Sequence, residues 1–171
     1  MFSLQTANPH FSLPIMHIKF VRVGKTRNEP IRSLVSDYFD RLRHLVSCEV
    51  IEAPDIAKKR SLTGETRLAA EAAAISKHLT GRGLTVVLDE GGKQKTSVEF
   101  AAWLQAEQNR GGREITFIIG GPEGISPVLC AQAQMSFSLG KMTWTHEMCR
   151  ALLVEQVYRA LCILRNIPYH K

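Results

Sequence analysis

Paired cysteines and long apolar runs are both missing from this chain. The four cysteines, Cys48, Cys130, Cys149 and Cys162, form no C-x-x-C pair and no regular framework, and each has apolar neighbours. This usage is typical of reduced, buried thiols in a cytoplasmic protein and argues against disulfides and zinc ligands. No apolar run approaches the roughly 20 residues that a membrane-spanning helix needs. We therefore expect a cytoplasmic protein that does not bind a membrane.

Several signatures of enzyme sites are also absent. The chain has no phosphate-binding G-x-x-x-x-G-K-[ST] loop and no G-x-S-x-G nucleophile turn. Residues 120–124 (GGPEG) do not fit the dinucleotide-binding G-x-G-x-x-G pattern. Residues 146–150 (HEMCR) look like a zinc-protease helix until the last position, where an arginine replaces the second histidine. Because a guanidinium cation cannot ligate zinc, we expect no metal site.

The bulk composition fits one globular domain of ordinary size. The chain has 171 residues, of which 44% are hydrophobic and 22% are charged. Its net charge of +6 favours an anionic partner, nucleic acid first, although many basic proteins bind none. Residues 1–15 lack the cationic start and apolar core of a signal peptide. We interpret them as a disordered extension or a start codon assigned too far upstream, and residues 16–171 as the single domain.

Strand and helix patterns alternate along the chain. Apolar runs closed by glycine or proline predict strands, and apolar residues at helical spacing predict helices. The alternation predicts a parallel sheet covered by helices on both sides, which is an α/β fold. We expect residues 90–93 (EGGK) to form a loop after the third strand. The predicted strands are 17–23, 47–53, 84–89, 115–119 and 135–139, and the predicted helices are 30–45, 65–79, 97–108 and 146–165.

Residues 115–124 (ITFIIGGPEG) combine an unbroken apolar run with an abrupt end in glycines and a proline. A run without alternation is typical of a strand buried on both faces, as in parallel sheets. A chain that leaves such a strand through glycines brings bare backbone N–H and C=O groups close to a ligand. The strand at 135–139 also runs into a loop of small residues and then a long helix. Two such loops at the carboxyl edge of one sheet predict a pocket walled by main chain.

The predicted helix at 146–165 carries apolar residues nearly all round. Such a helix needs burial on every side, and we expect its own domain to cover one face only. A symmetric partner subunit would cover the other face, so the pattern predicts a homodimer through this helix. The apolar residues are Ala151, Leu152, Leu153, Val154, Val157, Tyr158, Ala160, Leu161, Cys162, Ile163 and Leu164.

Four segments together resemble the RlmH family of SPOUT-class RNA methyltransferases: VVLDEGGK, FIIGGPEGIS, SFSLGKMTWTHEMCRALLVEQVYRA and the terminal PYHK. The resemblance covers essentially residues 16–171, and order, spacing and tail all agree. It implies an α/β-knot fold, in which the C-terminal third of the chain is threaded into a trefoil knot. It also implies a homodimer that binds S-adenosyl-L-methionine in the knot. The implied product is N3-methylpseudouridine in helix 69 of 23S rRNA, made on the assembled ribosome.

Carried over position by position, the resemblance implies contacts of the methyl donor with the two loops. The chemistry agrees, because adenine needs an apolar slot and backbone partners that small residues leave accessible. Simpler roles are turn geometry for the glycines, a core position for the leucine at the end of the third strand, and a core position for the tryptophan. The implied donor-binding residues are Leu88, Gly120, Gly121, Gly124, Leu139, Gly140, Lys141, Met142, Thr143 and Trp144.

The N3 proton of pseudouridine must leave before or during methyl transfer, so a nearby base or cation would help. The catalytic candidates are His146, Arg150, Tyr169 and His170, and which of them removes the proton stays open. A neutral His146 at a helix N-terminus could accept it. Arg150, one turn further on, could pair with phosphate or stabilise the imide anion. The resemblance implies that the tail with Tyr169, His170 and Lys171 folds back beside the donor.

Simpler roles exist for this region too. His146 could be a capping or structural histidine, and Arg150 could be solvated or paired across the dimer. Thr145 stands where the family commonly has proline, and we expect it to cap the last helix. Glu123, within the Gly-Pro-Glu-Gly turn, is expected to accept hydrogen bonds from loop amides rather than to act as a base.

Two other functions stay open on the sequence. One is a non-catalytic ribosome-binding protein that keeps only the fold and the basic surface, and it predicts ribosome binding indifferent to S-adenosylmethionine. The other is a small-molecule α/β enzyme with a nucleotide cofactor in the same pocket, and it predicts no affinity for RNA and an unknotted sheet.

Overall fold

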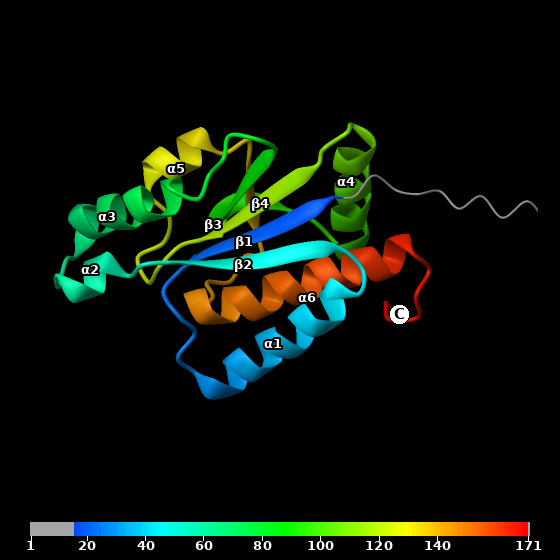
Figure 1. Cartoon of the computed structure of the whole chain (residues 1–171), viewed down its shortest axis with the longest axis horizontal. Coiled ribbons are helices and arrows are strands. Elements are labelled where there is room, and N and C mark those ends of the chain that lie inside the picture. Colours follow the sequence, from blue (N-terminus) through cyan, green and yellow to red (C-terminus); the bar gives the residue numbers. More distant parts are fainter. Residues whose placement is uncertain (1–15, 171) are drawn as a thin grey trace, which may run out of the picture.

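Five parallel strands form one sheet at the centre of the chain (Figure 1). Their order across the sheet is β2-β1-β4-β3-β5, and every neighbouring pair is parallel. The computed structural model describes residues 16–170, apart from the side chains of Lys58 and Lys59. The predicted extension at 1–15 and the terminal Lys171 lie outside the described residues. The strands are β1 (His17–Val23), β2 (Ser47–Ala53), β3 (Leu84–Gln94), β4 (Glu114–Ile119) and β5 (Met135–Ser138).

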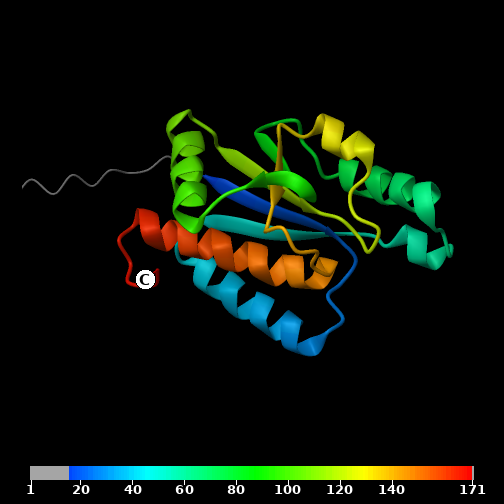
Figure 2. The same cartoon turned by 180° about the vertical axis from the view of Figure 1, so that it is seen from behind.

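Helices cover both faces of the sheet, which confirms the predicted α/β fold (Figures 1 and 2). Neighbouring residues of a strand point to opposite faces. Phe20 therefore lies in one core with side chains of α1, α4 and α6, whereas Val21 lies in a second core with side chains of α3 and α5. The helices are α1 (Glu29–Arg43), α2 (Ile56–Lys59), α3 (Gly64–Ser76), α4 (Ser97–Asn109), α5 (Pro127–Gln132) and α6 (His146–Leu164).

The structure departs from the prediction after the third strand and before the fifth. Residues 90–93 were predicted as a loop, but β3 continues to Gln94 and pairs again with β5 after an irregularity between Leu88 and Lys93. Gly92 makes this possible, since a Cβ there would lie 2.6 Å from the backbone nitrogen of Phe137. The six-residue α5 was missed because it is too short for a helical period, although Ser126 caps it and Pro127 begins it.

The last helix, α6, is covered by its own chain more fully than the sequence argument assumed. It packs between α1 and α4 and against the sheet, and every residue from His146 to Leu164 is buried or half-buried. The premise that the domain would cover only one face of α6 was therefore wrong, because α1 and α4 pack against it on two sides. The homodimer and the trefoil knot stay predictions of the family resemblance. Among residues 16–170, no helix is long and apolar enough to cross a membrane.

Candidate active site at the carboxyl edge of the sheet

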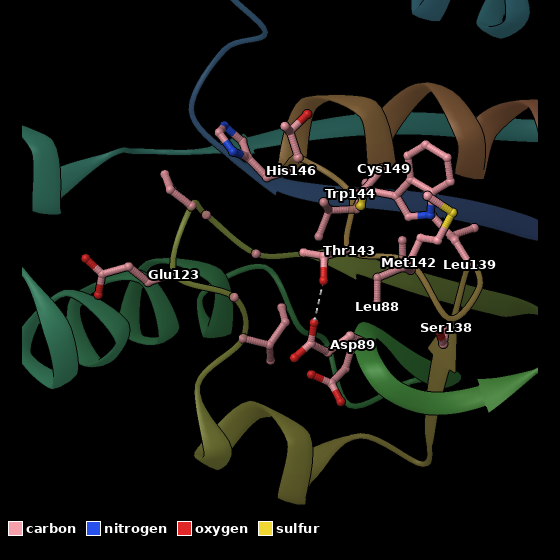
Figure 3. Close-up of a pocket in the computed structure, with 18 of the residues that line it drawn as sticks. Leu88, Asp89, Glu123, Ser138, Leu139, Met142, Thr143, Trp144, His146 and Cys149 are labelled. Atoms are coloured by element: carbon pink, nitrogen blue, oxygen red, sulfur yellow. Dashed lines mark hydrogen bonds between the residues drawn. The ribbon is translucent and has the colours of Figure 1, made fainter.

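A cavity of ≈ 560 Å³ opens where the carboxyl ends of β3, β4 and β5 meet (Figure 3). This is the edge of a parallel α/β sheet at which ligands ordinarily bind. Three segments wall it: the end of the regular part of β3 at 88–90, the loop 119–125, and the segment 138–146 together with Cys149. The predicted pocket between two small-residue loops is thus present in the fold. Within residues 16–170, no group of three His, Cys, Asp or Glu side chains is arranged to hold a metal ion.

The first wall is the glycine loop, residues 120–124, which closes tightly on itself. Gly121 and Gly124 form an isolated bridge, and the Gly124 N–H donates to the Gly121 carbonyl at 3.1 Å. A Cβ on Gly120 would lie 2.1 Å from the carbonyl oxygen of Gly124, which no side chain can occupy. Gly124 itself has φ +89°, a conformation that favours glycine. The glycines therefore serve turn geometry, and that geometry presents backbone groups to the cavity.

The second wall is the segment 138–146, which bridges β5 and α6. Ser138 Oγ donates to the Gly140 carbonyl at 2.8 Å, and the Gly140 φ of +144° turns the chain there. Thr143 Oγ1 donates to Glu90 Oε2 at 3.2 Å, which ties this segment to the end of β3 (Figure 3). The apolar side chains of Met142 and Trp144 are 71% and 40% exposed. This wall therefore combines a fixed backbone with apolar groups that are available for contact.

Polar groups lie at the cavity rim. Asp89 and Glu90 follow Leu88 at the end of the regular part of β3, and both line the cavity. Glu123 also lines it, but in Figure 3 its side chain points away from Leu88, Leu139 and Met142. That direction does not suit the role of a base acting at the cavity centre.

His146 is the first residue of α6 and lines the cavity. The side chain of Thr145 caps the helix by accepting from the Met148 N–H at 3.2 Å, as predicted. Burial lowers the pKa of His146 below its ordinary value of 6.5, and the positive charge of Arg150 lowers it further. The imidazole is therefore neutral at pH 7. The sequence argument reached the same protonation state through the helix dipole, whereas burial is the larger cause.

Arg150 lies inside the fold and does not line the cavity. Its side chain is 3% exposed, and it donates to the Val23 carbonyl at 2.6 Å and to Thr26 Oγ1 at 3.0 Å. Burial, together with the nearby charge of Arg22, lowers its pKa to about 10, so it stays charged at neutral pH. In this structure Arg150 fastens the end of β1 to α6. The guanidinium is engaged behind the cavity wall, and its predicted contact with phosphate or imide stays a prediction.

Glu147 completes the same attachment. Its two carboxylate oxygens accept from the backbone N–H groups of Arg27 and Asn28 at 2.8 and 3.1 Å. Burial acts to raise the pKa of Glu147, but these two donors and Arg150 outweigh it and the pKa is lowered. The first turn of α6, which carries His146, is thus held to the connection between β1 and α1.

Tyr169 and His170 do not line the cavity of their own chain. Tyr169 and His170 follow the end of α6 opposite to His146 (Figure 1), and 19 residues of helix span about 28 Å. The Tyr169 hydroxyl donates to Glu155 Oε1 and is 2.9 Å from the Tyr38 hydroxyl. Burial and these hydrogen bonds raise the pKa of Tyr169 well above its usual range. Within one chain Tyr169 is a structural contact between α1 and α6.

Most of the predicted site residues are therefore brought together. Every implied donor-binding residue except Lys141 lines the cavity, and so does His146, whereas Arg150, Tyr169 and His170 do not. Sequence reasoning could have found two of the omitted lining residues, because Asp89 ends a predicted strand beside Leu88 and Glu90 begins the predicted loop after it. The lining residues that the donor-site prediction omitted are Asp89, Glu90, Ile119, Pro122, Glu123, Ile125, Ser138, Thr145 and Cys149.

Comparison with known proteins gives a consistent result. A family model described as "Predicted SPOUT methyltransferase" matches residues 16–170. Curated relatives named ribosomal RNA large subunit methyltransferase H include proteins from Porphyromonas gingivalis, 40% identical over 155 residues, and from Christiangramia forsetii, 38% identical over 155 residues. A third, from Rhizobium johnstonii, is 38% identical over 159 residues. Each match covers 91% of this chain and 99% of the relative.

Solved structures share the fold at much lower identity. A probable methyltransferase from Bordetella pertussis is 11% identical with a TM-score of 0.54, over 85% of this chain and 95% of that one. A probable methylase family protein from Haemophilus influenzae is 11% identical with a TM-score of 0.52, over 91% of this chain and 70% of that one. Since the family model and the curated relatives span nearly the whole chain, it belongs to the SPOUT methyltransferase family, in the group of the ribosomal RNA large subunit methyltransferases H.

Proposed function

We propose that this protein transfers a methyl group from S-adenosyl-L-methionine to N3 of a pseudouridine in helix 69 of 23S rRNA, within the assembled ribosome. The observation that carries the proposal is the ≈ 560 Å³ cavity between the glycine loop and the segment 138–146. The name of the relatives supports a substrate in large-subunit rRNA. The net charge of +6 suits an anionic polymer. The position of the nucleotide and of the methylated atom follows from the family resemblance.

The residues around the cavity fit an adenosine-bearing donor. Leu88, Ile119 and Leu139 offer apolar surface for a purine, and the cavity volume lies in the range of small-molecule sites. A donor bound there would supply an electrophilic methyl group on a cationic sulfur. The carboxylates of Asp89 and Glu90 are acceptors for hydroxyl groups and attract positive charge. The glycine loop supplies backbone groups for the edge of the base.

His146 is the residue best placed to take the N3 proton. It lines the cavity, and burial together with the charge of Arg150 keeps its imidazole neutral at pH 7. A neutral imidazole has one nitrogen free to accept a proton. Arg150 contributes through this electrostatic effect and by holding the first turn of α6, instead of by contact with the substrate. Glu147 holds the same turn to the same connection between β1 and α1.

We also propose that the working protein is a cytoplasmic homodimer in which the tail of one chain lies beside the cavity of the other. The tail and His146 lie at opposite ends of α6. An antiparallel arrangement of two copies, with the tail end of one chain at the cavity end of the other, would bring each tail to the partner's cavity. Met142 and Trp144 support the pairing, because their exposed apolar surface at the cavity rim needs cover. We assign residues 1–15 no part in this assembly.

Calorimetric titration with S-adenosylmethionine and S-adenosylhomocysteine tests the proposal. We expect both to bind with one site per chain. Lack of binding to both would exclude the methyltransferase function. Binding of purified ribosomes that is unchanged by saturating S-adenosylhomocysteine, with no methyl transfer, would instead favour the non-catalytic ribosome-binding protein. Donor binding by a protein with no affinity for ribosomes would favour the small-molecule enzyme.

A further inference from the structure

A buried carboxylate lies directly behind the glycine loop. Glu71, on α3, is 4% exposed and accepts a hydrogen bond from the backbone N–H of Gly121. A Cβ on Gly121 would lie 2.5 Å from both of its carboxylate oxygens. The carboxylate therefore lies against the loop where Gly121 has no side chain. Glu71 itself does not line the cavity.

A charge network holds this carboxylate in place. Arg67, one turn earlier on α3, donates from Nε to Glu71 Oε1 at 2.8 Å. The same guanidinium lies 3.7 Å from Asp55 Oδ1. Asp55 in turn lies beside Gly24 at the end of β1, where an added Cβ would be 3.3 Å from the Asp55 Cβ. The network thus links the loop after β4 through α3 to Asp55, which lies close to the end of β1.

Burial of a carboxylate is costly unless it is paired and hydrogen-bonded. Burial raises the pKa of Glu71, and this is offset in part by Arg67 and by the Gly121 N–H. An apolar residue at this position would fill the core without that cost. A buried carboxylate whose two kinds of partner are a fixed cation and a loop amide is instead suited to fixing the position of the loop.

We propose that Glu71 is a positioning residue for the methyl donor, which fixes the backbone of Gly121 so that the cavity wall is formed before the donor binds. This inference rests on the proposed donor site. A preformed wall raises affinity because the loop does not have to be ordered on binding. Gly121 is required at its position because Glu71 occupies the space behind it.

A double-mutant cycle between Glu71 and Gly121 tests the inference, with calorimetric affinity for S-adenosylhomocysteine as the readout. Gly121→Ala in the otherwise unchanged protein should weaken binding by roughly tenfold or more, since the added methyl group meets the carboxylate. Glu71→Ala should weaken binding as well, because the loop loses its anchor. In the Glu71→Ala background, Gly121→Ala should cost less than about twofold, since the obstruction is gone. Gly121 has no positive φ that would penalise alanine independently.

Two further variants separate positioning from stability. Glu71→Gln keeps an oxygen acceptor in place and should hold the affinity within about threefold of the unchanged protein. Ile75→Ala, one turn further on α3 at a side chain that is 1% exposed and does not line the cavity, should lower the melting temperature and leave the affinity unchanged. If Glu71→Ala does not fold, affinity loss in Gly121→Ala with retention in Glu71→Gln is the supporting result.

Failure of the Glu71 proposal can be told apart from failure of the proposed function. If the unchanged protein binds no S-adenosylhomocysteine, the donor site itself is refuted. If it binds and Gly121→Ala weakens binding equally in both backgrounds, the donor site stands and the role of Glu71 is refuted. Equal affinity loss in Ile75→Ala and Glu71→Ala would also refute it, because general destabilisation would then explain both.

Discussion

Replacing Gly120 by alanine should weaken donor binding while the fold is kept. The added Cβ would lie 2.1 Å from the carbonyl oxygen of Gly124 and 2.7 Å from its carbon. Real Cβ contacts do not occur below 3.0 Å, so backbone has to move by close to an ångström. The bridge between Gly121 and Gly124 closes the loop, and it must open for this movement. The wall of the cavity is therefore displaced, whatever the donor itself contacts.

The size of the effect follows from this geometry. Overpacking of a fixed backbone costs typically about 1–3 kcal/mol. If that cost falls on the donor-binding conformation, affinity for S-adenosylhomocysteine drops by roughly 5- to 150-fold, since each 1.4 kcal/mol corresponds to about tenfold. The same cost lowers the melting temperature by roughly 2–12 °C, because about 1 kcal/mol shifts a domain of this size by roughly 2–4 °C. Calorimetry and thermal unfolding on one preparation measure both quantities.

Gly112→Ala is the matched control. Its Cβ would lie 2.7 Å from the carbonyl oxygen of Glu107, which is also a collision with backbone, but at the opposite end of β4 and away from the cavity. We expect it to lower the melting temperature to a similar extent and to leave the affinity unchanged. Unchanged affinity in Gly120→Ala, or an equal loss in Gly112→Ala, would refute the reasoning about the glycine loop.

Four further predictions follow from the structure. Leu161→Asp should lower the free energy of unfolding by roughly several kcal/mol, because Leu161 is 4% exposed within α6. An unchanged melting temperature would contradict its burial. His146→Asn should lower the methylation rate by at least about 100-fold. Because the folded pKa of His146 lies below 6.5, the activity of the unchanged enzyme should fall off on the acid side only below pH 6.5. The contribution of His146 to folding stability declines in the same pH range, since the unfolded chain takes up the proton first. Deleting residues 169–171 should abolish methylation of ribosomes and spare affinity for S-adenosylhomocysteine, whereas full methylation would leave the tail without a role in the site. A chain begun at Met16 should fold and methylate as the full chain does, and an insoluble product would show that residues 1–15 contribute to the domain.

The elements that sequence could predict are those decided by local burial patterns. The bounds of β1 and β2 agree with the prediction, because Gly24 closes the first strand and Pro54 closes the second. The prediction of a loop at residues 90–93 failed because it relied on their glycine content. In the structure the absence of a side chain on Gly92 allows β3 to pass against β5. That contact is tertiary and leaves no local periodicity.

The site also has parts that the sequence could predict and parts that it could not. Its two loops could be predicted, because parallel strands place their carboxyl ends at one edge. The position of Arg150 could not, since it depends on the Val23 carbonyl at the end of β1. Nothing in the sequence near Glu71 indicates its contact with Gly121, which arises only when α3 packs beneath the loop. The placement of the tail depends on α6 being one straight element that separates Tyr169 from His146.

Methyl transfer to ribosomes tests the central claim most directly. The purified protein would be incubated with labelled S-adenosylmethionine and with ribosomes from a strain that lacks the gene, and the 23S rRNA would then be digested and analysed by mass spectrometry. We predict one added methyl group per ribosome, on N3 of a pseudouridine in the helix 69 fragment, and a lower initial rate with the Gly120→Ala variant at donor concentrations below its Kd. Label that appears in another fragment, or no label despite donor binding, would contradict the account.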